Sequence, residues 1–211
     1  LNWNLILSSI IFIAAFLRFY QLGTIPPSLT WDETAWGYNA YSIGINGKDE
    51  FGKFLPLDFL ESFGDFKPPM YAYLDVIPVK FFGLNEFAVR FPSAFFGTLT
   101  VLLTYFLVKR IFWKSKQGKY YALFATFFLA ISPWHILLSR AAFEANVASF
   151  FIVLGIWGFL AAVQDRRWYL IISSVSFALS MYTFNTARIV SPVLVLVLVF
   201  CFRRELLKLK K

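Results

Sequence analysis

The stretch ANVASFFIVLGIWGFLAAVQ, residues 145–164, contains no charged side chain. A helix of about 20 apolar residues is long enough to cross the hydrocarbon core of a bilayer. Similar charge-free runs cover residues 1–17 and 168–187, and another extends over residues 91–139 with one basic cluster inside it. These runs predict a protein embedded in a membrane.

The composition of the whole chain has the same character. Hydrophobic residues make up 59% of it and charged residues only 15%, whereas soluble domains carry about 25% charged residues. The formal net charge is +8, but the basic residues gather between the apolar runs, which is typical of membrane topology signals. We therefore predict no nucleic-acid partner. The lone Cys201 excludes a disulfide framework and a cysteine-based metal site.

The order of the runs predicts an all-α polytopic membrane protein with about six transmembrane helices. The expected spans are residues 3–19, 87–108, 120–138, 145–164, 168–187 and 189–202, the last of which could borrow FNTAR and carry Arg188 to the interface. No basic residue precedes the first run and no small-residue cleavage site follows it, so we expect a retained span and not a signal peptide. The connector KRIFWKSKQGK, residues 109–119, holds five Lys or Arg and no acid, which predicts a cytoplasmic location.

That orientation places residues 22–86 outside, as a large first extracytoplasmic loop containing short juxtamembrane helices. DETAWGYNAYSIG suggests one short helix that stops at Gly44. PPMYAYLDVIPVKFFG suggests an amphipathic helix on the membrane, in which Asp75 and Lys80 lie off the apolar stripe and Pro78 bends or interrupts the chain. The stripe consists of Met70, Tyr73, Leu74, Ile77 and Phe81.

Two adjacent carboxylates, Asp32 and Glu33, open the first of these helices. Thr30-Trp31-Asp32-Glu33 fits a capping box, in which Glu33 reaches back to the Thr30 backbone. The functional alternative is a general base at the membrane face, which takes a proton from a hydroxyl nucleophile. The two interpretations are compatible, because a helix N-terminus would hold such a carboxylate rigid and ionised.

Two bases accompany the pair in the same region. Lys67 precedes PPMY, where it either snorkels among headgroups or binds a phosphate oxygen. Arg90, near the outer end of the second span, is an interface anchor or faces a carboxylate or a phosphate.

SPWHILLSRAAFEAN places His135, Arg140 and Glu144 around the turn between the third and fourth spans. Arg140 and Glu144 are four residues apart, so on one helix they would share a face and pair; near a membrane they are also functional candidates. His135 is the only histidine, which excludes a histidine-based metal cluster within this chain. The sequence shows neither a Ser/His/Asp array nor a phosphate-cradling glycine loop.

The ordered set RFYQLG, DE, KPPMYAYL, FGLNEFAVRFPSA and SPWHILLSR resembles the GT-C membrane glycosyltransferases. The likeness is closest to the dolichyl-phosphate-mannose protein mannosyltransferase-like group, which includes the aminoarabinose transferases. It implies an enzyme of the plasma membrane that moves a sugar, with inversion, from a polyprenyl-phosphate donor to an acceptor protein, lipid or glycan on the extracytoplasmic face.

The resemblance also assigns roles by position. Asp32 matches the proposed base and Glu33 its supporting neighbour, while Lys67, Arg90 and Arg140 match residues near the donor phosphate. Supporting roles fall to Glu144 and His135. No cofactor follows from these residues, and no metal ligand is assigned; some relatives use a divalent cation, which a single DE motif does not establish here.

Relatives continue through more spans, so we expect residues 1–211 to form a single transmembrane domain and the N-terminal part of a longer protein. Two alternatives stay open. A transporter or flippase shares the polytopic plan, although transporters place functional polar residues near the midplane. A truncated, non-catalytic relative is the other.

Overall fold

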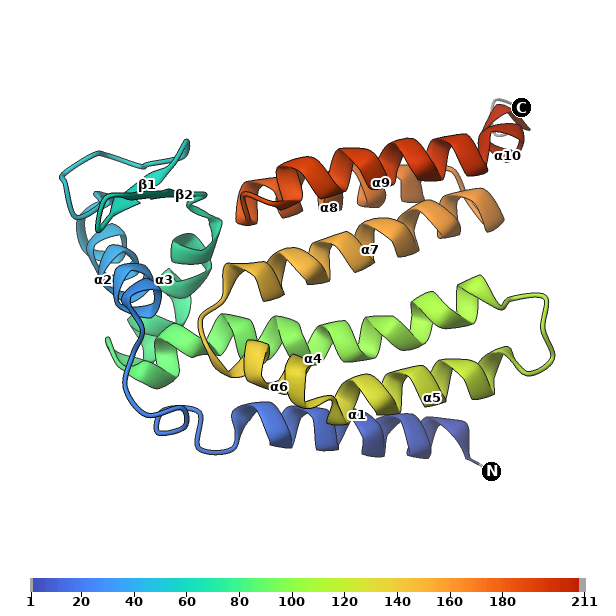
Figure 1. The fold of residues 1–211 in the computed structure, drawn as a ribbon, viewed down its shortest axis with the longest axis horizontal. Helices are drawn as coiled ribbons and strands as arrows, with labels where there is room; N and C mark the ends of the chain where they lie inside the picture. Colours follow the sequence, from blue (N-terminus) through green and yellow to red (C-terminus); the bar gives the residue numbers. More distant parts are fainter. Residues whose placement is uncertain (1, 209–211) are drawn as a thin grey trace.

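The structure is a computed structural model that describes residues 2–208. Six helices run alongside one another as an elongated bundle (Figure 1). They are α1 (Trp3–Phe19), α4 (Glu86–Ile111), α5 (Gly118–Ile131), α7 (Glu144–Gln164), α8 (Tyr169–Thr183) and α9 (Ala187–Cys201). Two shorter helices complete this part, α6 (Pro133–Arg140) and α10 (Arg203–Lys208).

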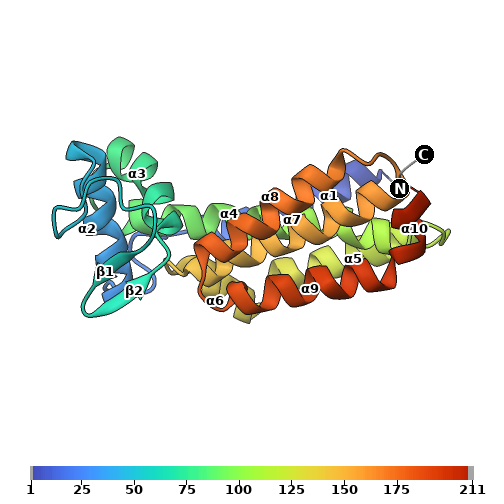
Figure 2. The ribbon, with the colours of Figure 1, turned by 90° about the horizontal axis from the view of Figure 1, so that it is seen from above.

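The segment between α1 and α4 forms a folded cap at one end of the bundle (Figures 1 and 2). It contains α2 (Trp31–Asn46), β1 (Leu60–Ser62), β2 (Asp65–Lys67) and α3 (Met70–Phe82). We call this segment the cap, and the end of the bundle where it lies the cap end. The α4–α5 and α7–α8 connectors lie at the opposite end, which we call the basic end.

The apolar helices correspond to the predicted spans. By length and composition, α4 and α7 can each cross a membrane, and α5 and α6 together pass the same test although they are bent by 57°. The remaining apolar helices, α1, α8 and α9, are shorter. The all-α polytopic fold is therefore confirmed, and α9 starts at Ala187, so that Arg188 lies in its first turn.

The third predicted span, residues 120–138, is wrong as a single continuous helix. It breaks at Ser132, and Pro133 occupies the first turn of α6. Proline has no backbone N–H to donate and is well suited to a helix start. The break turns α6 towards α1 and α4, against both of which it packs.

Small residues allow the helices to approach closely. Gly97 on α4 faces Ser139 on α6, where an added Cβ would come within 2.7 Å of the serine Cβ. On α7, Gly155 and Gly158 face Phe177 and Ser173 of α8 in the same way. Close packing of this kind is a main source of helix association in a membrane, where lipid removes the hydrophobic driving force.

The cap differs from expectation in three details. The antiparallel pair β1–β2 was not predicted, and its two turn residues Phe63 and Gly64 both have positive φ, at 53° and 74°. The α2 helix continues past Gly44 and ends at Asn46, and the next residue, Gly47, has a φ of 73°, in the left-handed region that favours glycine after a helix. Pro78 lies within α3 and does not interrupt it.

The α3 helix has apolar residues on both faces. Ile77 and Phe81, from the predicted stripe, are exposed, whereas Tyr71 and Ala72 are buried in a hydrophobic cluster that joins the cap to α4 and α7. Asp75 lies among these buried residues and has no exposed surface. The helix thus carries a carboxyl group into the interior of the protein.

Candidate active site

The acid pair lies at the start of α2, where the capping box is confirmed. The Thr30 backbone N–H donates to Glu33 Oε2 at 2.9 Å, and the Glu33 N–H donates to Thr30 Oγ1 at 3.3 Å. The two neighbouring carboxylates then diverge. Glu33 is buried, whereas the Asp32 side chain keeps 47% of its surface exposed.

Glu33 connects three parts of the chain. Arg90 Nε on α4 donates to Glu33 Oε1 at 2.7 Å, and the Ala142 N–H, between α6 and α7, donates to the same oxygen at 3.1 Å. Arg90 and Glu33 are both fully buried, so their charges attract each other with little screening by water. Arg90 therefore faces a carboxylate, which is one of the roles that its position in the sequence suggests.

Two arginines hold the segment that joins α1 to α2. Arg90 donates to the carbonyls of Leu22, Pro26 and Ser28 at 2.7–3.1 Å. Arg140 donates to the carbonyls of Leu17, Tyr20 and Ile25 at 2.7–2.8 Å. The end of a helix leaves carbonyls without partners, and a guanidinium can satisfy several at once. Both arginines thus act here as a clamp on the chain, and their contact with a donor phosphate stays a prediction.

Lys67, at the end of β2, contacts the carboxylate of Asp32. Its ammonium lies 3.8 Å from Asp65 and 5.4 Å from the centroid of the Trp36 ring. The lysine side chain is only 8% exposed, so the charge lies at the protein surface but is largely covered. The structure therefore brings Lys67 and the acid pair together.

The residues around α6 divide between two locations. Glu144 is close enough to Lys67 and Asp32 for their charges to act on it. It forms no ion pair with Arg140 within residues 2–208, so the predicted pairing is wrong: α6 ends at Arg140 and α7 begins at Glu144, and the two residues do not share a helix. His135 lies elsewhere, with its Nδ1 2.7 Å from Arg18 Nη2.

Asp75 and Tyr71, both on α3, lie beside the pair and were not singled out from the sequence. The Tyr71 hydroxyl donates to the Val89 carbonyl at 3.0 Å. Neither carboxylate oxygen of Asp75 has a hydrogen-bond partner within the described chain. Burial raises the pKa of Asp75 well above its usual range, and the negative charge of Glu33 raises it further. An acid inside the apolar string MYAYLDVIP is the signal that could have identified it.

Within residues 2–208, no group of three or more His, Cys, Asp and Glu side chains is arranged to hold a metal ion. The arrangement offers instead the exposed carboxylate of Asp32 beside the covered ammonium of Lys67. The buried ion pair of Glu33 and Arg90 lies next to them. A carboxylate and an ammonium are the groups that a proton transfer and an anionic leaving group require.

A family model described as dolichyl-phosphate-mannose-protein mannosyltransferase matches residues 66–211. The chain belongs to this family. The matched residues include Lys67, Arg90, Arg140 and Glu144. The match begins after Asp32 and Glu33.

Two curated proteins are similar to this family member. "Putative mannosyltransferase YkcB" of Bacillus subtilis (strain 168) is 27% identical over 167 residues, which are 78% of this chain and 21% of that protein. An uncharacterized protein of Aquifex aeolicus (strain VF5) is 31% identical over 147 residues, which are 68% of this chain and 29% of that protein. The chain thus spans between about a fifth and a third of the length of these relatives.

Solved structures show the same fold at lower sequence identity. ArnT from Cupriavidus metallidurans matches in the apo state with a TM-score of 0.70 and 16% identity, and bound to undecaprenyl phosphate with a TM-score of 0.72 and 14% identity. Each match covers 96% of this chain and 36% of ArnT. The resemblance to the GT-C membrane glycosyltransferases is confirmed at the level of family and fold.

Proposed function

We propose that this chain carries the catalytic end of a glycosyltransferase that takes a sugar from a polyprenyl-phosphate donor and transfers it, with inversion, to an acceptor hydroxyl. The reaction takes place at the cap end, on the extracytoplasmic face of the plasma membrane. The contact between exposed Asp32 and covered Lys67 carries the proposal. The family membership, and the polyprenyl phosphate bound to the structurally similar ArnT, support the donor class.

The ion pair of Asp32 and Lys67 implies an exchange of partners when the donor binds. A phosphate oxygen of the donor replaces the Asp32 carboxylate on the Lys67 ammonium, because a compact ammonium donates to either kind of anionic oxygen. The exchange frees Asp32 to accept a hydrogen bond from the acceptor. Donor binding thereby activates the base.

The sugar is then transferred in a single displacement step. The acceptor oxygen forms a bond to the anomeric carbon while its proton passes to Asp32, and the bond from that carbon to the phosphate oxygen breaks. Lys67 stabilises the charge that develops on the departing phosphate. Glu33 takes no part in the proton transfer of this scheme, because Arg90 and two backbone N–H groups already donate to its oxygens.

The test is sugar transfer by the protein from its complete reading frame, reconstituted with a polyprenyl-phosphate sugar. Asp32→Asn is expected to lower kcat by about 100-fold or more, which is the usual contribution of a general base. Lys67→Gln is expected to raise KM for the donor as well as lower kcat.

Asp65→Asn is the matched control, because Asp65 is an exposed acid near the same lysine. It is expected to leave kcat within about twofold, since exposed ion pairs contribute little. A full rate in Asp32→Asn would refute the role of Asp32, and an equal loss in Asp65→Asn would show that local charge alone is responsible.

A further inference from the structure

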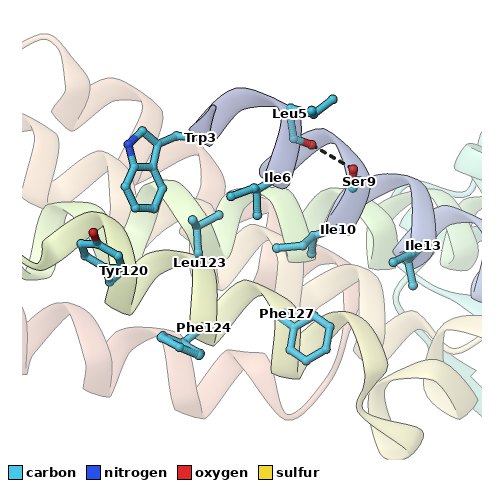
Figure 3. A pocket seen from close by; sticks show the side chains of 10 residues that line it. All are labelled: Trp3, Leu5, Ile6, Ser9, Ile10, Ile13, Tyr120, Leu123, Phe124 and Phe127. Atoms are coloured by element: carbon cyan, nitrogen blue, oxygen red, sulfur yellow. Dashed lines mark hydrogen bonds between the residues drawn. The ribbon is translucent and has the colours of Figure 1, made fainter. Parts of the chain in front are cut away.

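An apolar groove runs between α1 and α5, away from the cap (Figure 3). Its volume is about 550 Å³, and apolar side chains from both helices line almost all of it. Trp3 and Tyr120 stand at its end nearest the basic end, and Ile13 and Phe127 lie farther along it. The volume is in the range of small-molecule pockets, about 300–1,000 Å³.

A second hollow of about 430 Å³ opens beside the first at the basic end. The two share Trp3 and Tyr120, so that one continues into the other at this aromatic pair. The second is lined by the basic residues Lys109, Lys116 and Lys119. Apolar groove and cationic mouth thus form one amphipathic surface.

The three lysines have no carboxylate partner within residues 2–208. The adjacent Arg110 is different, because it is paired with Asp165 at 2.7 Å. The mouth therefore gathers uncompensated positive charge at the point where the groove opens. Tryptophan and tyrosine at such a boundary are typical of the bilayer interface.

We infer that this surface binds one anionic phospholipid of the cytoplasmic leaflet. An acyl chain lies in the α1–α5 groove, and the phosphate lies on the lysines of the mouth. Charge complementarity selects the occupant, because zwitterionic lipids bring no net charge to three unpaired ammonium groups, whereas basic pockets between spans hold anionic headgroups on this side of the membrane. The site is separate from the cap end and independent of the proposed transfer reaction.

The experiment is native mass spectrometry of the protein from its complete reading frame, released from nanodiscs with equal phosphatidylglycerol and phosphatidylcholine. The wild type is expected to retain phosphatidylglycerol over phosphatidylcholine by about tenfold. The double variant Lys116→Gln/Lys119→Gln is expected to lose most of that preference, because it removes two of the three ammonium groups that attract the anionic headgroup. Ser9→Phe, which fills the groove, is expected to lower retention of both lipids.

Arg166→Gln/Arg167→Gln is the matched control, because these exposed arginines belong to the other basic connector and do not line the groove. This control and Asp32→Asn are both expected to keep the wild-type preference. Equal retention of the two lipids by the wild type would overturn the inference, as would equal loss in the arginine control. Unchanged retention in Ser9→Phe would do so too, because the groove would then be covered by other parts of the protein. Displacement of phosphatidylglycerol by added polyprenyl phosphate would assign the groove to the donor tail and so also overturn it.

Discussion

At the start of α2, the neighbouring side chains of Asp32 and Glu33 have different environments. Asp32 points outward to Lys67, and Glu33 points inward to Arg90. Successive residues on a helix are about 100° apart, so one member of an acidic pair can lie in the interior while the other remains accessible. Glu33 therefore supports the fold, and Asp32 remains accessible as the proposed base.

The buried member gives a prediction for stability. Glu33→Gln leaves the buried Arg90 without its counter-charge, so the free energy of unfolding is expected to fall by about 3–5 kcal/mol. Denaturant unfolding in detergent measures it. The exposed Asp65→Asn is the control, with an expected change within about 0.5 kcal/mol. Equal stability of Glu33→Gln and the control would contradict the supporting role of Glu33.

Asp75 gives a prediction for pH dependence. The pKa of an aspartate in the unfolded chain is about 3.9, whereas burial raises the pKa of Asp75 in the folded protein. Between the two values the folded state keeps a proton that the unfolded state has lost, so this group makes stability fall as pH rises. Asp75→Asn removes the effect.

The gain in stability from Asp75→Asn is expected to increase by up to about 1.4 kcal/mol for each pH unit between the two pKa values. Paired unfolding measurements of the variant and the wild type at pH 4.5 and pH 7 give the difference. A difference that does not change with pH would mean that Asp75 ionises normally.

Replacing glycines within helices by alanine can distinguish the effect of close helix packing on stability from the effect of helix propensity. Gly97→Ala places a methyl group against Ser139 where α4 crosses α6, and overpacking of this kind is expected to cost about 1–3 kcal/mol. Gly44→Ala, inside α2, meets only an ordinary contact with Val76 at 3.4 Å. It is expected to stabilise by up to about 1 kcal/mol. Thermal unfolding of the two variants in the same detergent should move in opposite directions.

The helices themselves could be predicted wherever local composition determines them. The run at residues 145–164 became α7, and the capping box at Thr30 formed because its partners are three residues apart. The break at Ser132 could not be predicted, because the apolar run continues through it and proline is tolerated within membrane helices. The β1–β2 hairpin was missed because each strand has three residues and Phe63 adopts a positive φ that is uncommon for a bulky residue.

Part of the candidate group could be predicted from the sequence, but the partners of its members could not. The sequence indicates Asp32, Glu33, Lys67 and Arg90 as one group, and the structure brings them together. Whether an arginine meets a carboxylate, a phosphate or a backbone carbonyl depends on residues more than 50 positions away in the chain. No local pattern contains that information.

The orientation of the whole molecule in the membrane gives the last prediction. The lone Cys201 is first replaced by serine, and single cysteines are introduced as Gly52→Cys in the cap and Lys116→Cys at the basic end. A membrane-impermeant maleimide is expected to label Gly52→Cys on intact cells and Lys116→Cys only after permeabilisation, because basic connectors remain in the cytoplasm. Labelling in the reverse pattern would place the cap inside and contradict the proposed location of the reaction.

The clamp that Arg90 and Arg140 form on residues 17–28 has a consequence for biosynthesis. The chain is made from its N-terminus, so the segment before α2 leaves the ribosome long before Arg140 exists. Until α6 has been synthesised and has docked beside α1, the carbonyls of Leu17, Tyr20 and Ile25 lack the guanidinium that holds them. The acid pair therefore reaches its final geometry late, after α1, α4 and α5 have been synthesised, and a nascent chain arrested before Arg140 should have a cap that proteases still cleave.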